Sequence, residues 1–160
     1  MKLGLIADTH DHLDPRVGDL FRGVHHILHA GDVGQPDIVA ELETIAPVTV
    51  VAGNNDYYPG WRDTEVRELH GHRILVEHIV HPQTPSSTFL LRLRKSEARI
   101  VVFGHTHRPF HRELGGVLYL NPGSAGAPRH GLPATVCLLH LDGSSPRAEF
   151  LTMDNRPFLP

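Results

Sequence analysis

The stretch VTVVAGNNDYYPG, residues 48–60, joins an apolar run to a cluster of polar side chains. The run from Val48 to Val51 is typical of a strand buried on both faces. It ends at Gly53, Asn54, Asn55 and Asp56, where a chain commonly only turns. Open α/β sheets bind ligands beyond the carboxyl ends of their strands, so we interpret this cluster as part of a functional site.

Strand and helix patterns alternate before this stretch. Residues 3–8 and 25–32 are apolar runs predicted as strands, and residues 15–24 and 36–46 are predicted as helices with proline near each start. Repeats of this kind with continuous apolar strands favour a parallel sheet covered on both faces.

The pattern becomes richer in strands after Pro59. Residues 65–78 predict two strands joined through His70 and Gly71, and residues 86–98 predict a helix with a serine cap. Further strands are predicted at residues 99–107, 116–124, 134–143 and 148–154. An α/β front half and a β-rich back half indicate one domain over residues 1–160, with two packed sheets and helices outside.

Composition narrows the functional classes. The net charge of −3 gives no electrostatic reason to expect a nucleic acid or membrane partner. The fourteen histidines suggest metal chemistry, although most of them are expected on the surface. The single Cys137 excludes an internal disulfide and is expected to be a small buried hydrophobe. The short apolar run at the N-terminus does not fit a signal peptide, so a cytoplasmic protein is expected.

Metal-binding residue types follow five of the predicted strands. They are Asp8 and His10, Asp32, Asn54, His78, and His105 with His107. Carboxylates and imidazoles together suit Mn, Fe, Zn, Ni or Co better than Mg or Ca. Seven ligands exceed one tetrahedral site, but they divide naturally if one carboxylate bridges two ions roughly 3.5–4 Å apart.

This ordered set resembles the calcineurin-like metallophosphoesterases, and above all their small single-domain bacterial and archaeal phosphodiesterases. The family pattern is D-x-H, G-D, G-N-x-D/E, a histidine, and G-H-x-H. It reads here as Asp8-Thr9-His10, Gly31-Asp32, Gly53-Asn54-Asn55-Asp56, His78, and Gly104-His105-Thr106-His107. The resemblance implies a four-layer α-β-β-α sandwich of two mixed sheets flanked by helices.

The resemblance also implies roles for these positions. Asp8, His10 and His107 would hold a first divalent ion, and Asn54, His78 and His105 a second. Asp32 would bridge the two ions, with manganese expected first and Ni, Fe, Zn or Co as alternatives. A water or hydroxide shared by the ions would attack phosphorus, and the catalytic residues would be Asp32, Asn54, Asn55 and His105.

Two positions depart from the family pattern. Many relatives have a histidine that protonates the leaving group where this chain has Asn55, which can donate a hydrogen bond to a phosphoryl oxygen but cannot give up a proton. We therefore expect a preference for phosphodiesters or activated esters. His78 lies in Glu77-His78-Ile79-Val80-His81 rather than in Thr-His-Gly. Glu77 either supports the metal ligands or, as we favour, faces the other side of its strand.

Several further side chains carry open interpretations. His81, His111 and His130 are candidates for the missing proton donor. Asn121-Pro122-Gly123-Ser124 either shapes the floor of the metal pocket or forms a simple turn. Arg108 and Arg129 could bind phosphate, although an exposed, solvated position is the simpler expectation for both.

The expected partner is a small phosphorylated substrate, with no membrane and no nucleic acid partner expected, and a homo-oligomer left open. One alternative is a non-catalytic metal-binding scaffold, as in the metallophosphoesterase-like subunit of the retromer complex. Another is a phosphomonoesterase. A nuclease ranks lower because no basic patch with interleaved aromatic residues is present.

Overall fold

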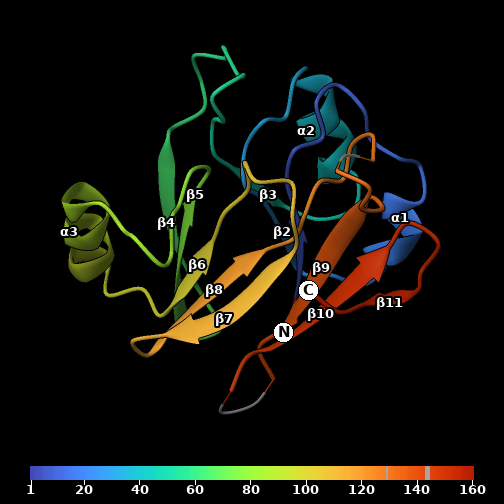
Figure 1. Ribbon diagram of the computed structural model, residues 1–160. Coiled ribbons are helices and arrows are strands. Elements are labelled where there is room, and N and C mark those ends of the chain that lie inside the picture. The colour runs from blue at the N-terminus through green and yellow to red at the C-terminus, as the bar shows by residue number, and fades with distance from the viewer. Residues whose placement is uncertain (129, 143–144) are drawn as a thin grey trace.

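Two β-sheets form the centre of the protein (Figure 1). The computed structural model describes residues 1–128, 130–142 and 145–160. One sheet has the strand order β11-β10-β9-β1-β2-β3 and the other β4-β5-β6-β8-β7. The strands of the first sheet are β1 (Lys2–Ile6), β2 (His26–His29), β3 (Val48–Val50), β9 (Thr135–His140), β10 (Arg147–Thr152) and β11 (Pro157–Phe158). Those of the second are β4 (Thr64–Leu69), β5 (His72–Glu77), β6 (Ile100–Val102), β7 (Phe110–Leu114) and β8 (Val117–Asn121).

Both sheets are mixed. Strands β1, β2 and β3 pair in parallel, as predicted, and β9 and β10 add to β1 in antiparallel directions. In the second sheet, β5, β6 and β8 are parallel, and the edge strands β4 and β7 are antiparallel to their neighbours. The carboxyl ends of the parallel strands therefore lead into the loops that carry the polar residues identified in the sequence.

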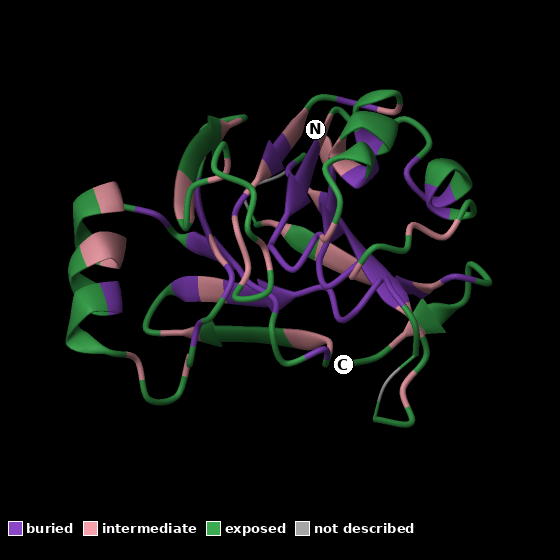
Figure 2. Cartoon of the chain, turned by 90° about the horizontal axis from the view of Figure 1, so that it is seen from above, coloured by how far each residue is buried: buried purple, intermediate pink, exposed green. Residues whose placement is uncertain are grey.

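Three apolar clusters separate four layers. One lies between the two sheets and includes Ile74 and Val76 of β5. Leu75 points the other way, toward the cluster beneath helix α3 (Ser87–Ser96). Helices α1 (Val17–Leu20) and α2 (Asp37–Glu43) cover the outer face of the first sheet through the third cluster. Figure 2 shows the buried strands in the middle and the more exposed helices on both flanks, which is the expected sandwich.

Most predicted elements are present, with shorter bounds. The helix predicted over residues 15–24 is reduced to α1, and Gly23, with φ +73°, follows it in the left-handed region that suits glycine. Ser86 caps α3 as predicted, because its Oγ accepts a hydrogen bond from the backbone N–H of Phe89 at 3.1 Å. Strand β7 was not predicted, since its exposed, largely polar FHREL sequence shows no apolar run.

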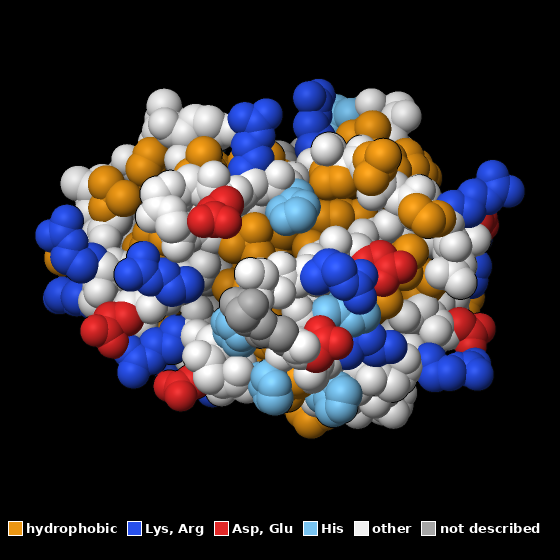
Figure 3. All heavy atoms as spheres, turned by 90° about the horizontal axis from the view of Figure 1, so that it is seen from below, with side chains coloured by type: hydrophobic (Ala, Val, Ile, Leu, Met, Phe, Trp, Pro, Cys, Tyr) orange, Lys and Arg blue, Asp and Glu red, His pale blue; other side chains and the backbone are white. Residues whose placement is uncertain are grey.

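The histidines and the cysteine lie where composition suggested. Of the fourteen histidines, His29, His78 and His107 are buried and the others are at least partly exposed. Figure 3 shows several of them on one surface, among basic and acidic side chains. Cys137 is free and fully buried. Among the described residues, no helix has both the length and the apolar character that crossing a bilayer requires.

Candidate metal centre

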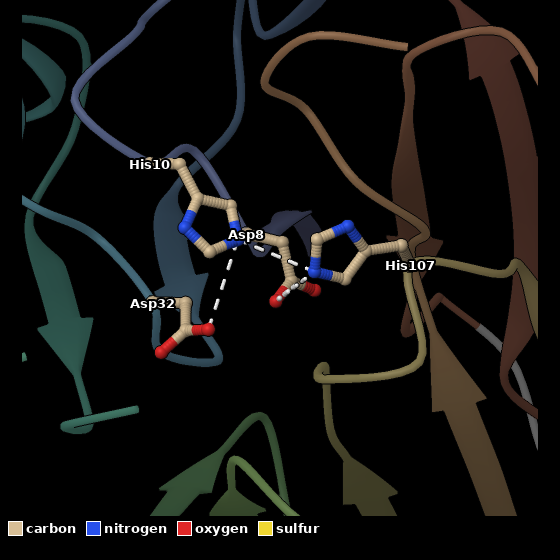
Figure 4. A group of neighbouring side chains, drawn as sticks. All are labelled: Asp8, His10, Asp32 and His107. Carbon is tan, nitrogen blue, oxygen red and sulfur yellow. Dashed lines mark hydrogen bonds and ion pairs between the residues drawn. The ribbon is translucent and has the colours of Figure 1, made fainter. Parts of the chain in front are cut away.

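Four side chains that can bind a metal converge at the carboxyl ends of β1, β2 and β6 (Figure 4). Each of Asp8, His10, Asp32 and His107 offers one ligand atom, and these atoms all lie within 4.8 Å of one another. His10 Nε2 lies 3.2 Å from His107 Nε2, and His107 Nε2 lies 3.4 Å from Asp8 Oδ1. Two carboxylates and two imidazoles form a donor set suited to a divalent transition metal.

Asn54, His78 and His105 form a second group beside the first. Asn54 Oδ1 lies 2.9 Å from His105 Nδ1 and 3.1 Å from His78 Nε2. The two groups meet at Asp32, whose Oδ2 is 3.7 Å from His10 Nε2 and 3.5 Å from His78 Nε2. The fold thus brings together all seven side chains predicted as ligands.

The backbone is strained at many of these residues. Positive φ angles, rare for residues other than glycine, occur at a subset of the seven: Asp8 (55°), His10 (46°), Asp32 (51°), His105 (68°) and His107 (57°). Such strain persists only where the surrounding structure fixes it, and it is concentrated at functional sites. Five of the ten non-glycine residues with positive φ in the described part of the chain belong to the seven, and aspartate and histidine adopt this region more readily than most residue types.

Glycines before the ligands allow two loops to touch. A Cβ atom on Gly53 would lie 2.1 Å from the backbone nitrogen of Asp32. Gly31 has φ +90°, and a Cβ there would lie 2.8 Å from Nδ1 of His78. A larger residue at position 53 would push its loop away from Asp32, and one at position 31 would push the loop of Asp32 away from His78.

Asp56 fastens the same loops, a role that the sequence analysis missed. Its carboxylate accepts hydrogen bonds from the backbone N–H groups of Gly53 (2.8 Å), Gly34 (2.9 Å) and Val33 (3.1 Å). The signal was available, because Asp56 is the last residue of the G-N-x-D/E pattern. Its side chain holds the backbone beside Asp32 and Asn54.

A buried network between Thr9 and His29 was also missed. The backbone N–H of Gly31 donates to His29 Nδ1 at 3.2 Å, so the ring proton is assigned to Nε2, which donates to Thr9 Oγ1 at 3.0 Å. The Thr9 hydroxyl donates to the carbonyl oxygen of Val33 at 2.9 Å. Burial lowers the pKa of His29 to about 3, which keeps the ring neutral. The network joins the loop of Asp8 and His10 to the loop of Asp32.

The segment from Asn121 to Ser124 is hydrogen-bonded to the loops that carry Asp8 and His105. The side-chain amide of Asn121 donates to the carbonyl oxygen of Gly104 at 2.7 Å and to Thr106 Oγ1 at 3.1 Å. The Ser124 hydroxyl donates to the carbonyl oxygen of Asp8 at 2.9 Å. The backbone N–H of Gly123 also donates to Asn121 Oδ1 at 2.9 Å, as in a local turn, so a role in shaping the pocket floor stays a prediction.

The surroundings of Asp32 favour its ionised form, and those of His105 favour its neutral form. Burial alone would raise the pKa of Asp32, but hydrogen bonds from His78 and Asn55 outweigh it and hold this pKa well below its usual range. Burial, together with the charge of His78, lowers the pKa of His105. Burial would lower the pKa of His78, yet its hydrogen bonds to Asp32 and the Ala30 carbonyl raise it.

The other candidate residues take varied positions. Glu77 faces away from the centre and binds Arg92 through both carboxylate oxygens, at 2.6 and 2.9 Å, as the favoured interpretation expected. The His130 ring centroid lies 6.2 Å from that of His107, whereas His111 packs against Phe150. Arg108 and His81 are exposed. Arg129 lies outside the described residues.

Comparison with known proteins agrees with this geometry. The sequence profile of the calcineurin-like phosphoesterase superfamily domain matches residues 1–144. The chain belongs to this superfamily. It is 39% identical over 159 residues to a probable metallophosphoesterase of Methanothermobacter thermautotrophicus, a match that covers 94% of this chain and 92% of the relative.

Solved structures of superfamily members share the fold. An archaeal phosphodiesterase is 26% identical, with a TM-score of 0.76 and coverage of 94% of this chain and 100% of the other. A variant of Vps29 from Entamoeba histolytica is 28% identical, with a TM-score of 0.78 and coverage of 95% and 92%. The family and the candidate metal cluster together identify a metal-dependent phosphoesterase.

Proposed function

We propose that this phosphoesterase is a phosphodiesterase that works with two divalent ions. Asp8, His10 and His107 would hold one ion, and Asn54, His78 and His105 the other. The observation that carries this division is the position of Asp32, whose Oδ2 lies within 3.7 Å of a nitrogen in each group. Bound ions would supply Lewis acidity to the phosphoryl oxygens and would lower the pKa of a shared water.

The protonation of the side chains supports this assignment. A bridging carboxylate must be ionised, and the lowered pKa of Asp32 keeps it ionised at neutral pH. A histidine ligand must be neutral, and the lowered pKa of His105 favours that form, whereas His78, whose pKa is raised, would have to lose a proton when an ion binds. Asn55 orients Asp32 through its backbone N–H and its side-chain amide, and one amide hydrogen remains to meet a phosphoryl oxygen.

Charge near the centre favours a diester over a monoester. A monoester carries an additional negative charge, which further cations would have to balance. Among the described residues that line the cavity beside Asn54 and His78, the one cation is Arg92, and Glu77 already pairs with it. The likeness to an archaeal phosphodiesterase supports the same choice.

The proposal is tested by removing metal from the purified protein and restoring it with Mn, Ni, Zn or Mg separately. We expect two ions per chain by elemental analysis, hydrolysis of bis(p-nitrophenyl) phosphate, and slower hydrolysis of p-nitrophenyl phosphate. Manganese is expected to restore the highest activity. Activity with a single bound ion would contradict the two-ion assignment, and faster monoester hydrolysis would favour a phosphomonoesterase.

A scaffold role is the second candidate, and the structural likeness to Vps29 is the observation that favours it. The same experiment separates the two functions. Tight binding of metal without turnover of either ester would favour a scaffold.

A further inference from the structure

A cavity of about 310 Å³ opens beside the candidate metal centre. Asn54 and His78, which are proposed ligands of the second ion, form part of its wall. The rest of the wall includes Asp63, Thr64, Ile79 and Arg92. The cavity therefore adjoins the candidate metal centre through these two side chains.

Successive side chains of β5 point to opposite faces of the sheet, and this explains how the cavity and the metal centre share a wall. Val76 points into the core between the sheets, and Glu77 points to the opposite side, where it meets Arg92 of α3. His78 returns to the inner side, toward Asp32 and Asn54. Figure 1 shows α3 standing outside β4 and β5, so the cavity has the helix on one side and the metal loops on the other.

Arg92 is held rigidly in this wall. Its Nε donates to Glu77 Oε2 at 2.9 Å and its Nη2 to Glu77 Oε1 at 2.6 Å, a paired geometry that fixes the guanidinium plane. Thr64 Oγ1 donates to Glu77 Oε2 at 3.4 Å and adds a weaker contact. Nη1 of Arg92 makes no hydrogen bond to any residue that the structure describes, so its N–H groups can serve a ligand.

The charges of the wall select the kind of ligand. Glu77 balances Arg92, and Asp63 adds an exposed carboxylate to the wall. A second phosphate would be repelled, whereas hydroxyl groups can donate to Asp63 and accept from Arg92. Ile79, whose side chain is 41% exposed, offers an apolar surface to the carbon skeleton of the ligand.

We infer that this cavity binds the uncharged, hydroxylated alcohol arm of a phosphodiester, such as a sugar, while the phosphate lies at the metal centre. The volume is at the small end of the range of ligand pockets and suits one such group. This inference rests on the proposed phosphodiesterase function and adds a substrate class to it.

Three p-nitrophenyl diesters with the same leaving group test the inference. The second ester group is thymidine, attached through its 5′ oxygen, in the first compound, methyl in the second and p-nitrophenyl in the third. The series therefore compares a hydroxylated arm, a small arm and an aromatic arm without hydroxyl groups. We expect the metal-loaded protein to show the highest kcat/KM with the thymidine ester. Arg92→Lys keeps the positive charge but loses the paired hydrogen bonds to Glu77. We compare kcat/KM for the thymidine ester with kcat/KM for the methyl ester, and this ratio should fall by about 3- to 10-fold in the variant.

Two further variants complete the test. Asp63→Asn changes an exposed side chain of the wall and should lower the same ratio, mainly through KM. Arg94→Lys, on the exposed part of α3 and outside this cavity, is the matched control and should leave the ratio as it is. If Arg92→Lys and Asp63→Asn slow all three esters equally, or none, the cavity does not bind this arm, although the phosphodiesterase proposal stands. If the unaltered protein hydrolyses none of the esters, the proposed function itself fails.

Discussion

Asn55 holds both oxygens of Asp32, its backbone N–H donating to Oδ1 at 2.9 Å and its side-chain amide donating to Oδ2 at 2.7 Å. Asn55 therefore orients the carboxylate at the centre of the site. Its carboxamide suits this task, because it donates hydrogen bonds without changing charge.

Replacing Asn55 with alanine should weaken metal binding. The change removes the side-chain hydrogen bond that orients Asp32, and losses of such supporting bonds typically cost about 10- to 100-fold in metal affinity. Calorimetric titration of the metal-free protein with Mn²⁺ measures the effect. Gln83→Ala, at an exposed position, is the control. An affinity equal to that of the unaltered protein would show that Asn55 does not orient Asp32.

Replacing Asp32 with asparagine should weaken both ions together. Asparagine keeps the size of the side chain but removes the charge and one of the two oxygen ligands that a bridge requires. Elemental analysis after dialysis against a fixed metal concentration gives the number of ions retained. Asp37→Asn changes an exposed carboxylate on α2 and should retain two ions. Loss of one ion alone from Asp32→Asn would mean that the ligands divide differently.

Reaction rates should depend steeply on the leaving group. Asn55 cannot protonate a departing alkoxide, and general acid catalysis typically contributes ~10²–10⁴-fold, most of it for poor leaving groups. A series of aryl methyl phosphodiesters with phenols of graded pKa measures this dependence. A flat series would reveal a proton donor, and His130, which lies near His107, would be the first residue to replace.

Replacing Thr9 with valine should destabilise the fold at the metal loops. Valine has the same shape but leaves the buried Nε2–H of His29 without its acceptor, which costs about 1–3 kcal/mol. Urea unfolding of the metal-free protein measures the change, and Thr9→Ser, which keeps the hydroxyl, should recover most of the loss. We also expect weaker Mn²⁺ binding in Thr9→Val, since the network joins the loops of Asp8 and Asp32. Equal stability of the valine and serine variants would contradict the network.

Acid should remove a small contribution of Asp14 to stability. The hydrogen bond from Arg16 lowers the pKa of Asp14 from 3.8 to about 2 in the folded protein. A pKa that is lower in the folded state stabilises the fold above the unfolded value, and the contribution is lost as pH falls from about 4 through about 2. Arg16 is about half exposed, so we expect about 0.2–1 kcal/mol. The difference in unfolding free energy between the unaltered protein and Asp14→Asn should be present at pH 6 and mostly lost at pH 2. A difference that does not change with pH would exclude this ion pair as its cause.

The sequence alone determined the order of the strands that carry the site and the residue types at their ends. Apolar runs followed by Asp8, Asp32 and Asn54 were sufficient, because buried parallel strands need continuous hydrophobic sequence and expose their next residues at one edge. The predicted α/β sandwich was confirmed for the same reason. Strand β7 was not predicted because its own sequence is polar. It forms a strand through its pairing with β8.

Only the tertiary structure decided which residues hold the ligands in place. Asp56 and Thr9 bind backbone groups of a loop more than twenty residues away, and although Asp56 belongs to the G-N-x-D/E pattern, that pattern does not show which groups it binds. The same is true of the positive φ at Asp8 and Asp32, which the packed loops impose against local preference. The order of residues shows which side chains are available for chemistry. The distances between these side chains and the strain of the backbone arise only when segments remote in the chain pack against one another.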